Sequence, residues 1–157
     1  MSEEQKPASS DGASRKARAL SARLSAVQAL YQVSQNRQPM RVVLDEYLHH
    51  RSGMEVQGER LVQPDEVLLK AILYGVEECR AELESVVDAN LKKDAQDRVV
   101  EPLLRSILIC GAYELLIQNI DKPIIINDYL NVAHSFYERN EVALINGVLD
   151  SVASVFR

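Results

Sequence analysis

The chain has 157 residues, of which 46% are hydrophobic, enough for one domain with a buried core. Its net charge of −5 excludes a general attraction to nucleic acid, so any RNA binding must come from a local basic patch. No uninterrupted run of about 18 apolar residues is present to span a membrane, and the N-terminus lacks the apolar segment of a secretory signal. The sequence therefore predicts a cytoplasmic protein.

The N-terminal part of the chain divides into a tail and a long helix. Residues 1–13 are polar and offer almost nothing to bury, so we expect a disordered tail there. Ser14 is a candidate N-cap for a helix that ends near Gln35. The apolar residues of this helix recur in steps of four and three and predict one buried face, made of Leu20, Leu24, Val27 and Tyr31.

The middle of the chain contains two further predicted helices. The first is short and covers residues 42–50, and the glycine-containing stretch 51–63 is expected to be a loop. Pro64-Asp65-Glu66 is typical of a helix start, and the apolar pattern that follows continues to Leu91. Residues 92–98 are charged and are expected to form a solvated break.

Three apolar helical segments between Arg105 and Asp150 complete the chain, with breaks at residues 121–123 and 138–140. Pro123 suits the first turn of a helix, and Asn140 is a candidate N-cap. Runs of β-branched residues are too short and isolated to indicate a sheet. The predicted fold class is all-α.

Three glycines stand at a regular spacing, since Gly75, Gly111 and Gly147 are each 36 residues apart. A repeat of this length is found in helical solenoids. The residues between the glycines do not match, however, and the first helix would remain unexplained. We therefore favour the hypothesis that these glycines mark close crossings of helices in a bundle.

Nothing in the sequence points to catalysis, a metal or a cofactor. Cys79 and Cys110 form no CxxC pattern and lie in apolar helical segments, so they are expected to be buried reduced thiols. His49, His50 and His134 stand in no metal-ligand pattern with cysteine or carboxylate. No glycine-rich phosphate loop or nucleophile elbow occurs. We predict that the protein is not an enzyme.

One basic cluster stands out from the acidic remainder of the chain. Four cations and no acid lie between Ser14 and Leu24, namely Arg15, Lys16, Arg18 and Arg23. They form a candidate phosphate-contacting site for RNA, although many such clusters are simply solvated helix starts. Four contacts to a single strand would give a slope of about −3 in log K against log salt.

Four short motifs lie in register over nearly the whole chain: AVQALYQ (26–32), GAYELL (111–116), IND (126–128) and NGVLD (146–150). Together they resemble the NusB family of transcription antitermination factors. The resemblance implies a single helical domain over residues 14–157. In it, two three-helix bundle subdomains, about 14–91 and about 100–157, pack crosswise.

The resemblance also implies a function and its partners. NusB proteins pair with NusE, a small-subunit ribosomal protein, bind single-stranded boxA RNA in ribosomal RNA leaders, and act indirectly on RNA polymerase. The family's arginine-rich motif is only partly kept, because non-basic residues occupy three of its positions, at Ala19, Leu20 and Ser21. A basic residue and an aromatic residue of the family are likewise replaced by Ala143 and Leu144.

Four further residues are candidate contacts, and the first three carry two interpretations each. Tyr31 either stacks on an unpaired base or packs in the core, and Gln28 either contacts RNA or faces solvent. Asn146 either contacts RNA or is a buried amide bonded within the bundle. Glu114 is a candidate NusE contact on an exposed face of the helix over residues 102–118, by analogy with the family.

Two alternatives remain for the function. The first is a helical protein-interaction adaptor that binds NusE or forms a homodimer and has little direct RNA affinity, as the replaced basic and aromatic residues suggest. The second is the RNA-binding domain of a ribosomal RNA methyltransferase, which is disfavoured because no methyl-donor domain follows Arg157.

Overall fold

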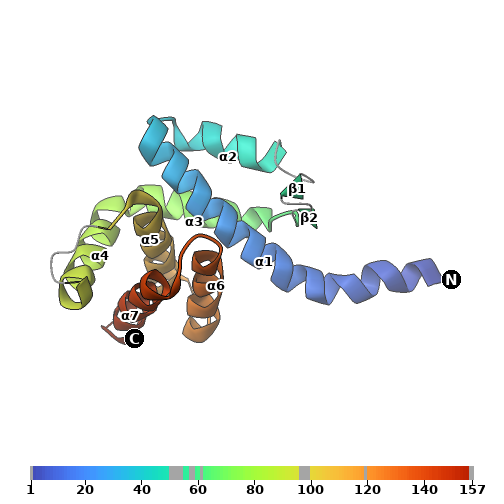
Figure 1. Ribbon diagram of the computed structural model, residues 1–157. Coiled ribbons are helices and arrows are strands. Elements are labelled where there is room, and N and C mark those ends of the chain that lie inside the picture. The colour runs from blue at the N-terminus through green and yellow to red at the C-terminus, as the bar shows by residue number, and fades with distance from the viewer. Residues whose placement is uncertain are drawn as a thin grey trace.

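The computed structural model of the protein describes residues 2–49, 55–56, 59–60, 62–95, 100–118 and 120–155. Within these ranges the chain forms seven helices and one antiparallel pair of two-residue strands, so the all-α class is confirmed (Figure 1). The elements are α1 (Ser2–Asn36), α2 (Met40–His49), β1 (Glu55–Val56), β2 (Glu59–Arg60), α3 (Glu66–Glu78), α4 (Arg80–Ala95), α5 (Pro102–Ile117), α6 (Lys122–His134) and α7 (Arg139–Val155).

The helices form two groups around a shared core. α1, α2 and α3 pack against one another, whereas α4, α5 and α6 each pack against α7. α1 runs diagonally across the molecule and also contacts α5 and α6 (Figure 1). One continuous cluster of buried apolar side chains extends through both groups. The N-terminal group therefore packs across the C-terminal group as one body.

The single helix expected from residue 64 to Leu91 is in fact two helices. Asp65 caps α3 as expected, because its side chain accepts a hydrogen bond from the Leu68 N–H at 3.1 Å. The chain then leaves helical geometry at Cys79, with φ −108° and ψ 22°. This break lets α4 turn away and pack against α5 and α7. α4 therefore belongs mainly to the C-terminal group, and not to the N-terminal unit that was expected to end near Leu91.

α1 begins at Ser2, where the sequence predicts a disordered tail over residues 1–13. A helix that is already formed adds one hydrogen bond for each further residue it fixes, so α1 continues outward from its packed part. Its first turns project away from the other helices (Figure 1). Backbone hydrogen bonding between successive turns accounts for this extension.

Two of the three regularly spaced glycines lie where helices cross. A Cβ added to Gly75 on α3 would lie 2.2 Å from Cζ of Tyr113 on α5. A Cβ added to Gly111 on α5 would lie 2.9 Å from Cδ2 of Leu149 on α7. The hypothesis of close helix crossings is confirmed at these two positions.

The breaks of the C-terminal group are only partly as expected. Pro123 lies in the first turn of α6, which confirms its predicted role. Asn140 is not an N-cap, because α7 already begins at Arg139 and the Val142 N–H donates to the Glu138 carbonyl at 3.0 Å. Of the helices in the described part of the chain, none is long and apolar enough to cross a membrane.

Candidate functional site

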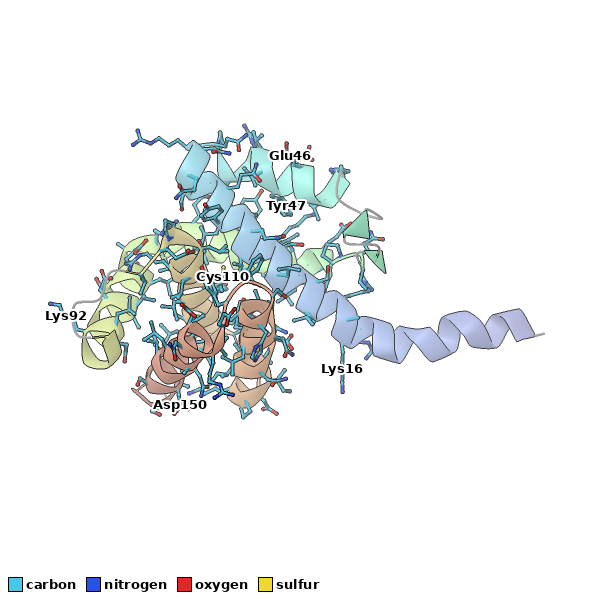
Figure 2. All side chains as sticks on the ribbon, in the orientation of Figure 1. Lys16, Glu46, Tyr47, Lys92, Cys110 and Asp150 are labelled. Carbon is cyan, nitrogen blue, oxygen red and sulfur yellow. The ribbon has the colours of Figure 1, made fainter. Side chains whose placement is uncertain are left out.

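The four cations of the predicted basic cluster do not share one environment, because three are exposed and one is buried. Arg15, Lys16 and Arg18 are exposed on α1, and Lys16 points away from the helix (Figure 2). None of the ion pairs between described residues involves these three side chains. Arg23, by contrast, is only 3% exposed. Three exposed cations of α1, which form no ion pair with a described residue, therefore remain as candidate phosphate contacts.

Arg23 has a structural role. Its Nε and Nη2 donate to Oε2 and Oε1 of Glu114 at 2.8 Å each, and its Nη1 donates to Oδ2 of Asp128 at 2.8 Å. The hydroxyl of Tyr129 donates to Oε2 of Glu114 at 2.6 Å. The cluster joins α1 to α5 and α6 and satisfies a carboxylate that has no solvent exposure.

The same contacts keep Arg23 charged although it is buried. Burial alone acts to lower the pKa of the Arg23 guanidinium, but the hydrogen bonds and charge of Glu114, helped by Asp128, outweigh it and raise the pKa above its ordinary value. Burial, followed by the charge of Glu114, also raises the pKa of Tyr129. The predicted role of Arg23 as an RNA contact is therefore wrong.

Glu114 cannot serve as an exposed partner contact, because it is 0% exposed. α5 is buried along almost its whole length, from Leu104 to Leu115 with the exception of the half-buried Arg105. The expected NusE-binding face of this helix is thus occupied by the protein itself. The motif resemblance could not show this, since a motif carries no information on what covers a helix.

The predicted stripe of α1 is buried only in part: Val27 is fully buried, but Tyr31 at the end of the stripe is not. The small side chains of Ala22, Ala26 and Ala29 are fully buried and let α1 approach its neighbours closely. The buried face thus includes Arg23 and leaves Tyr31 37% exposed. The core interpretation of Tyr31 is therefore wrong, and its ring is available for contacts.

Tyr31 and Gln28 line one groove at the C-terminal half of α1. The other walls come from the start of α5, from α2 and from the turn between α6 and α7. The complete lining consists of Gln28, Tyr31, Gln32, Gln35, Asn36, Tyr47, Leu103 and Phe136. Two predicted RNA contacts are thus brought together, in a groove whose lining contains no charged side chain.

Phe136 is a lining residue that the sequence reasoning missed. It follows α6 in a tight turn, in which its N–H donates to the Ala133 carbonyl at 3.0 Å. It is 39% exposed although it is large and apolar. The sequence did contain a signal, because the pair Phe136-Tyr137 stands in a break between two helices. An aromatic residue there cannot be assigned to the buried face of a helix.

Asn146 lies apart from this groove. It is exposed on α7, so the interpretation as a buried amide is wrong. It is not among the residues that line the groove. Beside it, Ala143 is exposed and Leu144 is 9% exposed. An RNA contact at Asn146 would therefore be separate from the one at Tyr31.

The cysteines and histidines form no site in the part of the chain that the structure describes. Cys110 is buried, Cys79 is half-buried, and both are free thiols. His49 and His134 are exposed, and His50 lies outside the described residues. No group of three or more described His, Cys, Asp or Glu residues is arranged to hold a metal ion.

Comparison with solved structures shows the fold. One similar structure is NusB from T. maritima, with a TM-score of 0.69 and 21% sequence identity, over 86% of this chain and 89% of that one. Another is a crystal structure of the antitermination factors NusB and NusE in complex with dsRNA. Its matching chain gives a TM-score of 0.71 and 16% identity, over 91% of this chain and 98% of that one.

Comparison of sequences is more specific. The model of the NusB family matches residues 20–154. The transcription antitermination protein NusB of Novosphingobium aromaticivorans is 37% identical over 143 residues, which are 90% of this chain and 96% of that protein. The NusB protein of Allorhizobium ampelinum is 36% identical, over 87% of this chain and 86% of that protein. The chain therefore belongs to the NusB family, whose members are transcription antitermination factors and not enzymes.

Proposed function

We propose that this chain acts in antitermination by binding a single-stranded, boxA-type RNA along α1, together with NusE. The observation that supports this proposal most is that Arg15, Lys16 and Arg18 are exposed and form no ion pair with a described residue, on the same helix as the exposed ring of Tyr31. Cations neutralise phosphates, and an exposed ring stacks on bases. The protein then works in the cytoplasm and reaches RNA polymerase through the assembled complex.

The structurally similar NusB was solved in complex with NusE and dsRNA, which supports NusE and an RNA as partners of this chain. The burial of Glu114 removes the one NusE contact that the sequence suggested. We therefore assign NusE no face on this chain, and we propose the RNA surface alone in terms of residues.

Salt dependence of RNA binding tests this function. A labelled boxA-type RNA is titrated with the protein, with and without NusE, across a salt series. Since Arg23 is buried, three cationic contacts remain, and log K should fall against log salt with a slope of about −2. The variant R15A/K16A/R18A should bind more weakly and with a flatter slope. The variant R41A/K70A removes two exposed cations from α2 and α3 and should leave the slope unchanged.

The alternative function is a protein-interaction adaptor with little RNA affinity. It is favoured by one observation: Ala143, which replaces a basic residue of the family, is exposed on α7 and offers no charge there. Capture of NusE without any RNA binding in either condition would establish the adaptor and overturn the RNA-binding proposal. Sedimentation of the free protein would show whether it forms a homodimer.

A further inference from the structure

A second groove, between α2 and α3, lies outside the site described above. Its volume is about 480 Å³, and it is lined by Arg41, Val42, Leu44, Asp45, Leu48, His49, Lys70 and Tyr74. It shares no lining residue with the groove beside Tyr31. α2 lies at the upper edge of the molecule, away from α6 and α7 (Figure 1). This α2–α3 groove is therefore separate from the surface that the proposed function uses.

Exposed apolar side chains gather at the α2–α3 groove. Val42 on α2 and Tyr74 on α3 are each 44% exposed, and the half-buried Leu48 adds further apolar surface. Val67 is 79% exposed. It precedes Lys70 by three residues and Tyr74 by seven, so it shares their face of α3. An exposed apolar patch beside a groove is typical of a surface that binds another protein.

The free charges at the α2–α3 groove are positive, although the whole chain carries a net charge of −5. Arg41 on α2 and Lys70 on α3 are exposed, and neither forms an ion pair with a described residue. The acid in the lining, Asp45, is already engaged, because its Oδ1 lies 2.9 Å from Nδ1 of His49. Each of the two helices thus presents one cation, beside apolar surface, to a carboxylate of a partner.

The shape of the α2–α3 groove suits a helix. Its lining on α2 extends from Arg41 to His49, which corresponds to about 12 Å at 1.5 Å of helix rise for each residue. A partner helix covers that length with about two turns. Helices pack with the ridges of one in the grooves of another, and an amphipathic helix binds a groove through apolar side chains at every third or fourth position.

We propose that the α2–α3 groove binds an acidic amphipathic helix of a partner protein. The apolar side chains of that helix pack on Val42 and Tyr74, and its carboxylates pair with Arg41 and Lys70. RNA fits this groove less well, because a strand carries a negative charge at every nucleotide and meets the carboxylate of Asp45 in the lining. The inference goes beyond the proposed function and does not depend on RNA binding along α1.

Selection from a library of displayed helical peptides tests this occupant. Every peptide carries the same leucine stripe at positions i, i+3, i+4 and i+7, and the positions beside the stripe are randomised. Selection on the full-length protein should enrich Asp and Glu beside the stripe, whereas selection on R41E/K70E should enrich Lys and Arg. An enriched acidic peptide, labelled with fluorescein, should bind V42S and Y74S about tenfold more weakly than the unaltered protein, as expected for central residues of an interface.

Matched variants separate binding at the α2–α3 groove from other effects. I124S removes a side chain that is 53% exposed on α6 and should leave peptide binding unchanged. R15A/K16A/R18A should also bind the peptide normally, although it binds RNA more weakly. The unfolding midpoints of V42S and Y74S are measured to show that the fold is intact. R41E/K70E keeps every apolar side chain of the groove, so its reversed selection provides a second test.

The outcomes decide between an acidic helix and other occupants. The peptide should stay bound when NusE and a boxA-type RNA are added. No enriched peptide, an acidic preference that persists on R41E/K70E, or equal affinity of the unaltered protein, V42S and Y74S would overturn the proposal. Displacement of the peptide by NusE or by RNA would assign the groove to that partner and overturn it too. So would a homodimer in sedimentation that Y74S dissociates, because a second copy would then occupy the groove.

Discussion

Arg23 of α1 and Glu114 of α5 are joined by two parallel hydrogen bonds of 2.8 Å, at a point where neither side chain is more than 3% exposed. The pair ties the N-terminal helix to the centre of the C-terminal group. It also separates Arg23 from the exposed cations that precede it on the same helix. An arginine that sequence alone assigns to RNA binding is therefore part of the core.

Removing Arg23 should destabilise the protein without removing any exposed positive charge that could contact RNA. In R23A, the carboxylate of Glu114 stays buried and keeps only the hydroxyl of Tyr129 as a recorded partner. Loss of one member of a buried ion pair costs about 3–5 kcal/mol. We expect a fall of that size in the free energy of unfolding, measured by urea denaturation.

The double variant R23M/E114L tests whether the buried charge is the cause. Replacing both charges by apolar side chains leaves no unpaired carboxylate at position 114, so it should cost much less than the two single changes added together. R18A serves as the exposed control and should change stability by less than about 0.5 kcal/mol. Additive losses in R23M, E114L and the double variant would contradict this explanation.

Gly75 should not tolerate alanine, although alanine normally favours a helix over glycine by about 1 kcal/mol. A Cβ at this position meets the ring of Tyr113, which is 6% exposed and has little room to move. We expect G75A to lower the free energy of unfolding by about 1–3 kcal/mol, as overpacking does. G111A should cost less, because its Cβ meets the end of the Leu149 side chain.

A second-site change checks the cause of the G75A effect. In a Y113L background the ring is absent, so adding G75A should cost less than it does in the unaltered protein. Equal stability of G75A and the unaltered protein would mean that α3 and α5 do not approach as closely as described.

The rates at which the two cysteine thiols react with a labelling reagent should show how deeply each is buried in the core. Cys110 is 0% exposed, and burial, followed by the charge of Glu114, raises the pKa of its thiol, so the thiolate that reacts is scarce. Labelling of Cys110 should require unfolding and should accelerate in R23A. Cys79 is half-buried and should label faster. Each site is assigned by measuring C79A and C110A separately, and equal rates for both would contradict the described burial.

Most helices could be predicted from the sequence because apolar periodicity is a local signal. The start of α3 could be predicted because Pro64-Asp65-Glu66 is also a local signal. The exact buried face of α1 could not be predicted in the same way. Whether Tyr31 or Ala29 faces inward depends on how closely a neighbouring helix approaches. For the same reason the groove escaped prediction, since the chain brings Tyr31 and Phe136 together only through packing.

Acid should weaken the link between α4 and α5. Glu84 on α4 accepts hydrogen bonds from Nε of Arg80 at 2.7 Å and Nε of Arg105 at 2.9 Å, and Arg105 also bonds to Asp88. Burial acts to raise the pKa of Glu84, but the two guanidinium groups outweigh it and hold the pKa below its ordinary value of 4.5. The carboxylate is thus more acidic in the folded than in the unfolded chain.

The sign of the pH dependence follows from this lowered pKa. Glu84 contributes stability above the pKa of the unfolded chain, and this contribution is lost as pH falls through the lower pKa of the folded state. The unaltered protein should therefore be more stable than E84Q at neutral pH, with a difference that shrinks below about pH 4.5 and in high salt. E77Q removes an exposed carboxylate that forms no ion pair with a described residue, and it controls for net charge. Urea denaturation at several pH values measures the difference in the free energy of unfolding. A difference between the unaltered protein and E84Q that stays the same in acid would contradict the ion-pair assignment.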